Sequence, residues 1–277
     1  MVLNKKPIRL ILSDMDGTLL NADKCISRCN REAIQKAKKR GIDFTICTGR
    51  IQTMAQYYIQ DLEISVPVIT ANGALIWDSL EKRELWGQPV DREEAQALLE
   101  YCCDKKLDYC ALTMSDSYFS PGNIRRRRFE QYNQIAMRGG FVPMTLREFD
   151  YDWSCIRGKN IYKILIYETQ RNQLEGVKEK LKELHNTGYT SSEEGLLDVA
   201  HNSVSKGNGL LHLAEIMGIS PDEICAIGDY ENDISMLQES GFPVAMGNGC
   251  KQIKEVAMFV TKSNEEDGVA YAIEQLL

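Results

Sequence analysis

The sequence predicts an α/β fold in which a parallel β-sheet domain carries a second α/β domain inserted into it. The first observation is an alternation of short apolar runs with amphipathic stretches near the N-terminus, which returns in the C-terminal part of the chain. The second is a change of pattern between these two parts. The third is length, because 277 residues exceed the roughly 100–200 residues of one typical domain.

The two outer segments are expected to build one Rossmann-like sheet. The N-terminal segment has the order strand Ile8–Leu12, helix Arg28–Lys39, strand Phe44–Cys47, helix Ile51–Leu62 and strand Val68–Thr70. The C-terminal segment has the order helix Asn208–Met217, strand Ile224–Ile227, helix Asp233–Glu239 and strand Val244–Met246. Short apolar strands separated by helices are typical of a parallel sheet that is covered on both faces.

The middle of the chain predicts a different arrangement. Asn72-Gly73 predicts a turn between Val68–Thr70 and a strand at Ala74–Trp77, and Glu84–Trp86 is expected to pair with the latter as a hairpin. Further elements follow: helices Arg92–Lys105 and Gln173–His185, and strands Tyr109–Met114, Ile161–Tyr167, Tyr189–Ser191 and Leu196–Ala200. We therefore expect the inserted domain to span 87–199 and the sheet domain to comprise 1–86 and 200–277.

Composition excludes several classes of partner. A formal charge of -7 and a pI near 5.2 argue against binding nucleic acid or an anionic membrane, which requires a basic surface. No stretch approaches the roughly 20 apolar residues of a spanning helix, so we expect a cytoplasmic protein. We also expect a monomer or a weak homo-oligomer. The nine cysteines contain no C-x-x-C pair, and Cys47 is interpreted as a core residue at a strand end.

Two carboxylates follow the first predicted strand. In open parallel sheets ligands bind beyond the carboxyl ends of the strands, which is where Asp14 and Asp16 lie. Two carboxylates about 4 Å apart repel each other by roughly 4 kcal/mol at an effective dielectric constant near 20. The pair therefore requires a cation or a shared proton, which indicates metal binding or acid–base chemistry.

A second acidic pair, Asp229 and Asp233, follows the strand Ile224–Ile227. If that strand lies beside the first one, the four carboxylates converge into an all-oxygen cluster of the kind that suits Mg²⁺. Zinc is disfavoured because the chain has only three histidines, and their positions do not match the spacing of zinc ligands: His185, His201 and His212.

Two weaker signals complete the candidate site. Thr48-Gly49-Arg50 lies between a predicted strand and a predicted helix, where a hydroxyl and free backbone N–H groups favour an anion. Lys206 precedes the helix Asn208–Met217 and supplies a cation for a phosphate. Gly209 occupies a position where a helix former is usual, so the start of this helix is expected to be loose.

Taken together and in this order, these residues resemble the four motifs of the haloacid dehalogenase-like (HAD) phosphohydrolase superfamily. Asp14-Met-Asp16-Gly-Thr18 is similar to the first motif, Thr48-Gly-Arg50 to the second and Lys206 to the third. Gly228-Asp229-x-x-Asn232-Asp233 is similar to the fourth. The insert, Asn72-Gly73-Ala74 and the segment 245–249 resemble the Cof-type branch, which carries an α/β cap domain of the C2B kind.

The resemblance implies a phosphatase that hydrolyses phosphate monoesters of small metabolites, such as sugar phosphates or phosphorylated cofactors. It implies that Asp14 attacks phosphorus to form an aspartyl-phosphate and that Asp16 acts as general acid and base. It implies the Mg²⁺ ligands Asp14, Asp16 through its backbone carbonyl, Asp229 and Asp233. It implies the phosphate-binding residues Thr48, Gly49, Lys206 and Asn232.

Two other functions stay open: a phosphomutase of the same fold, and a sensor that binds a phosphorylated ligand without turnover. The intact Asp14 and Asp16 argue against the sensor. The basic run Arg125–Arg128, on an expected helix with Phe129 and Tyr132, could bind a second anion, although such runs are more often solvated helix faces. The sequence does not identify the substrate.

Overall fold

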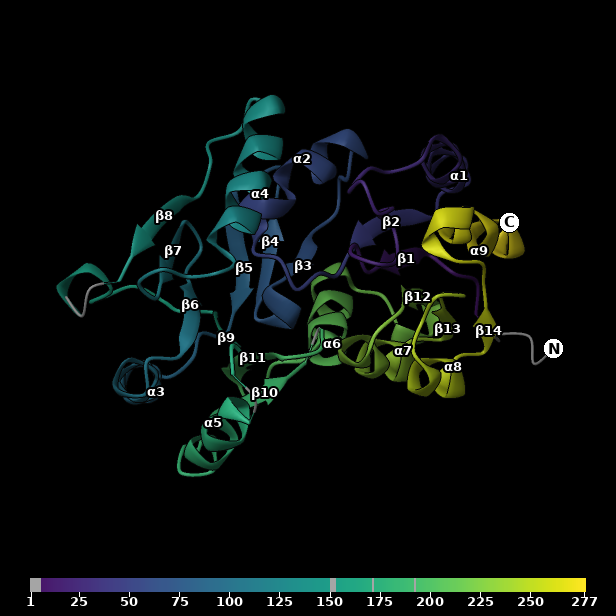
Figure 1. Cartoon of the computed structure of the whole chain (residues 1–277). Helices are drawn as coiled ribbons and strands as arrows, with labels where there is room; N and C mark the ends of the chain where they lie inside the picture. The colour runs from purple at the N-terminus through teal and green to yellow at the C-terminus, as the bar shows by residue number, and fades with distance from the viewer. Residues whose placement is uncertain (1–5, 150–152, 171, 192) are drawn as a thin grey trace. The chain divides into compact units, whose positions relative to one another are not determined.

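The chain forms two compact units (Figure 1). The computed structural model describes residues 6–149, 153–170, 172–191 and 193–277. The first unit comprises Met1–Gly49, Ile59–Trp86 and Ser205–Leu277, and the second comprises Arg50–Tyr58 and Gly87–Val204.

The first unit is built on a sheet of five parallel strands in the order β14-β13-β12-β1-β2. Their bounds are β1 Leu10–Ser13, β2 Asp43–Ile46, β12 Ile224–Gly228, β13 Phe242–Ala245 and β14 Phe259–Val260. β1 is buried along its whole length and pairs with β12 and β2. Segments more than 200 residues apart in the sequence thus share one sheet, with Ser13 beside Ile227.

Helices cover both faces of this sheet, with α1 and α9 on one face and α6, α7 and α8 on the other (Figure 1). Their bounds are α1 Arg28–Lys39, α6 Lys206–Met217, α7 Ile234–Glu239, α8 Lys251–Val256 and α9 Gly268–Leu276. Leu10 and Leu12 of β1 belong to one buried cluster with Leu210 and Leu213 of α6 and Met236 of α7. Because side chains alternate along a strand, the opposite face of β1 points toward α1 and α9.

A smaller sheet of three strands in the order β3-β4-β5 extends the first unit. It contains β3 Val68–Thr70, β4 Leu75–Asp78 and β5 Arg83–Gly87, and a short 3₁₀ turn, η1 Ala71–Gly73, connects the first two. This is the expected turn and hairpin. A bridge between Cys47 and Ile69 joins β3 to the end of β2. Cys47 is fully buried, which confirms its interpretation as a core residue.

One segment groups differently from expectation. Residues 50–58, which include most of α2 Gln52–Asp61, belong to the second unit although the sequence pattern placed them in the first. The contacts of Arg50 supply the reason, because its guanidinium lies 4.4 Å from the ring centroid of Tyr132. Such a cation–π contact fixes a side chain that hydrophobic periodicity alone does not assign.

The second unit contains a six-stranded sheet in the order β10-β11-β9-β6-β7-β8, antiparallel except for the parallel pair β7–β8. The strands are β6 Asp108–Leu112, β7 Asp116–Phe119, β8 Thr145–Glu148, β9 Lys163–Tyr167, β10 Thr187–Thr190 and β11 Leu196–His201. The helices are α3 Arg92–Asp104, α4 Arg126–Arg138 and α5 Gln173–Leu181. The parallel-sheet core with an inserted α/β unit confirms the expected fold class.

Alternate residues of this sheet face different helices. Tyr118 of β7 belongs to the buried cluster with side chains of α3 and α5. Its neighbour Phe119 instead contacts Phe129 of α4 edge to face, at a centroid distance of 5.0 Å. β7 and β8 were not expected from the sequence, whereas the helix that carries the basic run was. None of the helices in the described part of the chain combines the length and the apolar stretch that spanning a bilayer requires.

Two of the four arginines in the basic run share one carboxylate. Arg125 and Arg128 both form ion pairs with Glu193, and Arg125 also lies 4.8 Å from the ring centroid of Tyr167. These contacts support the structural interpretation of the run over an anion site.

Glu94 joins the first turn of α3 to the start of β10. Its carboxylate accepts hydrogen bonds from the backbone N–H groups of His185 and Asn186 and from the Thr187 hydroxyl. Replacing it with glutamine is expected to lower the free energy of unfolding by about 1–2 kcal/mol at neutral pH, because charge-assisted bonds to backbone donors are lost. Glu93→Gln, an exposed neighbour in the same turn, is the matched control for urea denaturation.

The loss of stability in Glu94→Gln should become smaller as the pH falls into the acid range. Partial burial raises the pKa of the Glu94 carboxyl, but the hydrogen bonds from Thr187, Asn186 and His185 outweigh it and place the pKa below the ordinary 4.5. The stabilisation is therefore complete above that ordinary value and disappears as the pH falls through the folded-state pKa. A difference between native protein and Glu94→Gln that stays constant through acid pH would contradict this origin.

Candidate active site

The site forms at the carboxyl end of β1, where Asp14 leaves the sheet. The Asp14 backbone N–H donates to the carbonyl of Ile227 at 2.9 Å, which fixes the residue between the ends of β1 and β12. Only 5% of Asp14 is exposed. The parallel pairing of β1 with β12, which the sequence analysis assumed, brings the two acidic motifs to the same edge of the sheet.

Lys206 lies at the centre of the acidic group. Its ammonium donates to Asp14 Oδ1 at 2.6 Å and to Asp233 Oδ1 at 2.5 Å, and its side chain is 1% exposed. The helix α6 starts at Lys206 itself, two residues earlier than expected, because the Ser205 hydroxyl accepts from the Asn208 N–H at 3.0 Å as an N-cap.

Glycines allow these backbones to approach each other. A Cβ on Gly209 would lie 3.0 Å from the Cα of Gly73, so the glycine is required for the packing of α6 against η1. The expectation of a loose helix start was therefore wrong. Gly73, with φ +100°, likewise has the Ser205 carbonyl where a Cβ would stand.

Asp229 and Asp233 are held by backbone and hydroxyl donors. The second oxygen of Asp233 accepts from the N–H groups of Asp229 at 2.9 Å and Tyr230 at 3.0 Å. Thr18, which is fully buried, donates its hydroxyl to Asp229 Oδ1 at 2.9 Å. These bonds orient both carboxylates toward Asp14.

Carboxylate oxygens of Asp14, Asp229 and Asp233 lie within 4.8 Å of one another. Burial, followed by repulsion from Asp233 and Asp229, raises the pKa of Asp14 well above its usual range, although Lys206 opposes the shift. Burial and then Asp233 raise the pKa of Asp229 to about 7. Burial alone would lower the pKa of Lys206, but Asp14 and Asp233 raise it overall. Three carboxylates against one ammonium leave two negative charges, so the cluster attracts a cation.

Asp16 lies apart from this cluster. Its side chain is 29% exposed and accepts from the ammonium of Lys24 at 2.7 Å. Gly17, with φ +87°, then turns the chain so that Asp16 forms a bridge with Leu20. The carboxylate of Asp16 therefore stands at the more open side of the site.

The expected phosphate-binding residues lie around the same strand ends. Thr48 is 1% exposed, and its N–H donates to the carbonyl of Ile69 at 3.0 Å. Gly49 is the last residue of the first unit's N-terminal segment. Asn232 donates its amide to Asn72 Oδ1 at 3.1 Å, which connects the β12 loop with η1.

The sequence analysis assigned no positioning role at the site to three residues that have one: Thr18, Lys24 and Asn72. Thr18 lies within the first motif, so its place in that motif is the signal that could have identified it. Asn72 has φ 58°, a left-handed conformation that asparagine adopts more readily than most residues. No sequence feature pairs Lys24 with Asp16, because that contact depends on the path of the loop.

Known proteins are similar to this chain in sequence and in fold. A family model described as haloacid dehalogenase-like hydrolase matches residues 11–273. The Bacillus subtilis 5-amino-6-(5-phospho-D-ribitylamino)uracil phosphatase YwtE is 36% identical, with 98% of each chain covered. The phosphatase YwpJ of the same organism is 31% identical and covers 98% of this chain and 100% of its own. A haloacid dehalogenase-like hydrolase structure from B. subtilis has a TM-score of 0.84 at 29% identity, covering 98% of this chain and 100% of its own.

The fold and the buried acidic site define a hydrolase of phosphate esters. The chain belongs to the haloacid dehalogenase-like hydrolase family. The relatives YwtE, YwpJ and YcsE of B. subtilis are named phosphatases, which agrees with a phosphoric monoester hydrolase acting on small phosphorylated metabolites.

Proposed function

We propose that this chain is a Mg²⁺-dependent phosphatase that hydrolyses monoesters of small metabolites through an aspartyl-phosphate on Asp14. The observation that carries the proposal is the contact of Lys206 with both Asp14 and Asp233, beside Asp229, in a buried site. This arrangement fixes a carboxylate nucleophile and supplies positive charge next to it. Phosphoryl transfer depends mainly on such positioning and charge neutralisation.

The donor set fits Mg²⁺. All three clustered side chains offer carboxylate oxygens, and the two uncompensated charges equal those of one divalent ion. Asp14, Asp229 and Asp233 would hold it together with the backbone carbonyl of Asp16. A bound Mg²⁺ would supply charge that keeps Asp14 ionised and stabilises the phosphoryl oxygens.

The chain's own residues then divide the reaction between them. A carboxylate oxygen of Asp14 attacks phosphorus, the bond from phosphorus to the alcohol oxygen breaks, and Asp16 gives that oxygen a proton. Water next attacks the aspartyl-phosphate, Asp16 takes a proton from it, and the bond from phosphorus to Asp14 breaks to release inorganic phosphate. The partly exposed position of Asp16 supports its role, because it must meet both the leaving alcohol and water.

The phosphoryl group is bound by Thr48, Gly49, Lys206 and Asn232. Lys206 contributes charge, and the other three contribute hydroxyl, backbone and amide donors. The Asn232–Asn72 bond supports this role, because it orients the Asn232 amide before substrate arrives.

The substrate class includes phosphorylated polyols joined to a small ring. Three B. subtilis relatives named 5-amino-6-(5-phospho-D-ribitylamino)uracil phosphatase, at 36%, 31% and 27% identity, support this choice. The test is phosphate release from that compound within a panel of sugar phosphates and phosphorylated cofactors, with the products identified. An isomerised ester in place of inorganic phosphate would overturn hydrolysis in favour of a mutase.

Removal of metal is expected to reduce phosphate release by at least about 100-fold, because the ion supplies several kcal/mol of charge stabilisation in the transition state. The measurement compares release in EDTA with release after Mg²⁺ is restored. Full activity in EDTA would contradict a metal role for the cluster.

Gly17→Ala tests whether Asp229 is a metal ligand, because the added methyl group displaces its carboxylate. A Cβ at residue 17 would lie 2.4 Å from Asp229 Oδ2, so the carboxylate must move. We expect Mg²⁺ affinity, measured by calorimetry, to fall roughly 10- to 100-fold, the loss typical of changes around a metal ligand that disturb its orientation.

Gly41→Ala is the matched control for this variant. Gly41 also has positive φ, at +78°, but a Cβ there meets nothing within 4 Å. It therefore carries the same backbone strain without the clash. Equal Mg²⁺ affinity in both variants would contradict the placement of Asp229 as a ligand.

A further inference from the structure

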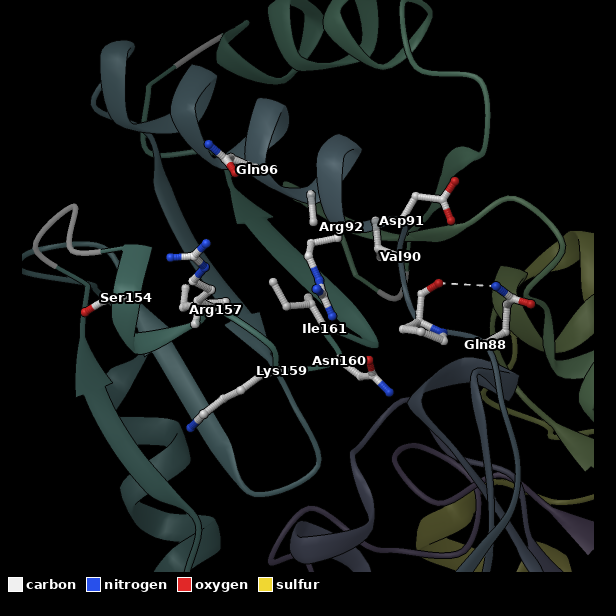
Figure 2. Close-up of a pocket in the computed structure, with 13 residues that line it drawn as sticks. Gln88, Val90, Asp91, Arg92, Gln96, Ser154, Arg157, Lys159, Asn160 and Ile161 are labelled. Atoms are coloured by element: carbon white, nitrogen blue, oxygen red, sulfur yellow. Dashed lines mark hydrogen bonds between the residues drawn. The ribbon is translucent and has the colours of Figure 1, made fainter.

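The second unit contains a pocket of about 740 Å³ that the proposed reaction does not use (Figure 2). Two segments line it, residues 88–96, which lead into and begin α3, and residues 154–161, which lead toward β9. None of the candidate active-site residues contributes to its lining. The volume lies within the ~300–1,000 Å³ range of pockets that bind small molecules.

Part of the lining is apolar and well packed. Val90, Ala95, Ile156 and Ile161 line the pocket, and each is at most 7% exposed. The Val90 N–H donates to the Ile161 carbonyl at 2.8 Å, which holds the two segments together. The apolar wall of the pocket is therefore made of packed side chains on two segments that a backbone hydrogen bond joins.

The charged side chains of the lining are predominantly basic: Arg92, Arg157 and Lys159. Within the described residues, Arg92 and Arg157 are exposed and form neither an ion pair nor a hydrogen bond. Figure 2 shows Arg92 extending from α3 toward Asn160 and Ile161. Lys159 is fixed by Asp116 at 2.8 Å, so it contributes less free charge.

The single carboxylate of the lining does not neutralise these arginines. Asp91 accepts a hydrogen bond from the Asn186 amide at 2.6 Å, and Figure 2 shows its carboxylate directed away from Arg92. In a chain of net charge -7, this leaves a local excess of positive charge beside an apolar surface. Amide groups of Gln88, Gln96 and Asn160 offer further donors and acceptors.

We propose that this pocket binds a small organic anion, with its phosphate, carboxylate or sulfonate group on Arg92 and Arg157. The apolar body of the ligand contacts Val90, Ile156 and Ile161. Guanidinium groups suit this task because they bind planar and tetrahedral anions through paired N–H donors. The pocket is thus a second ligand site of this chain, separate in its residues from the phosphatase site.

The test uses 8-anilinonaphthalene-1-sulfonate, an aromatic body that carries one anionic group. Its fluorescence is titrated with native protein and with the double variant Arg92→Gln/Arg157→Gln. The dissociation constant is expected to rise about tenfold or more in the double variant, because two charge-assisted contacts are lost. Hydrogen exchange should show protection by the probe in peptides that cover residues 88–96.

Arg127→Gln/Arg138→Gln is the matched control, because both arginines are exposed on α4 of the same unit and the net charge changes equally. It is expected to leave the dissociation constant unchanged. All variants alter exposed side chains, and an unchanged melting temperature shows that the probe reports on folded protein. An unchanged constant in the Arg92/Arg157 variant, or an equal rise in both double variants, would overturn the proposal.

Discussion

Asp14→Asn is expected to abolish phosphate release, with a loss on the order of 10⁴-fold or more, because an amide cannot form the covalent intermediate. The fold should remain intact. Burial and two neighbouring carboxylates already disfavour the charge on Asp14, so its removal does not destabilise metal-free protein. Lys206 keeps its second partner, Asp233. The measurement combines phosphate release with a melting temperature, which should be unchanged or higher.

The matched control for this variant is Asp23→Asn, the same substitution at an exposed position of the loop that follows β1. It should leave turnover unchanged. Turnover of Asp14→Asn within tenfold of the native rate would show that another group attacks phosphorus. A variant that is inactive and also melts well below the native protein would instead assign Asp14 a structural role.

Much of the core could be predicted because its residues carry local signals. Each acidic motif directly follows an apolar strand, and the carboxyl ends of parallel strands share one edge of a sheet. The sequence could not show that β1 and β12 are neighbours, because strand order is a property of the whole fold. The sequence analysis therefore contained it only as a condition, and the pairing of Ser13 with Ile227 demonstrates it.

The contacts that hold the site could not be predicted, because they join side chains far apart in sequence. The Thr18–Asp229 bond spans 211 residues and the Asn72–Asn232 bond spans 160. Gly209 was misinterpreted for a related reason. Helix propensity treats glycine as a weakness, whereas here tertiary packing against Gly73 requires it.

The inserted unit was harder to predict because its sheet is mixed. β7 is a short polar strand, DSYF, that is nevertheless fully buried. Its burial depends on partners such as Met144 and Phe129, which periodicity in a four-residue window does not reveal. The basic run on α4 carried a signal for charge, but its pairing with Glu193 lies outside any local pattern.

The second large effect is expected from Lys163 and Asp198, a buried ion pair on the neighbouring strands β9 and β11. Their charged atoms lie 2.5 Å apart, and the side chains are 5% and 1% exposed. Asp198→Ala is expected to lower the free energy of unfolding by about 3–5 kcal/mol, because it leaves a buried ammonium without its counter-ion. Lys163→Met should cost a similar amount.

The double variant Lys163→Met/Asp198→Leu should recover most of this loss, because apolar side chains of similar volume need no desolvation of charge. Urea denaturation measures the free energy of unfolding of the native protein, the two single variants and the double variant, which together form a double-mutant cycle. Hydrogen exchange in β9 and β11 localises the change to the second unit. The exposed pair Lys182–Glu179, at 2.6 Å, is the control and should show no measurable coupling. If the double variant is as unstable as either single one, the sheet requires the ion pair itself and not only the filled volume.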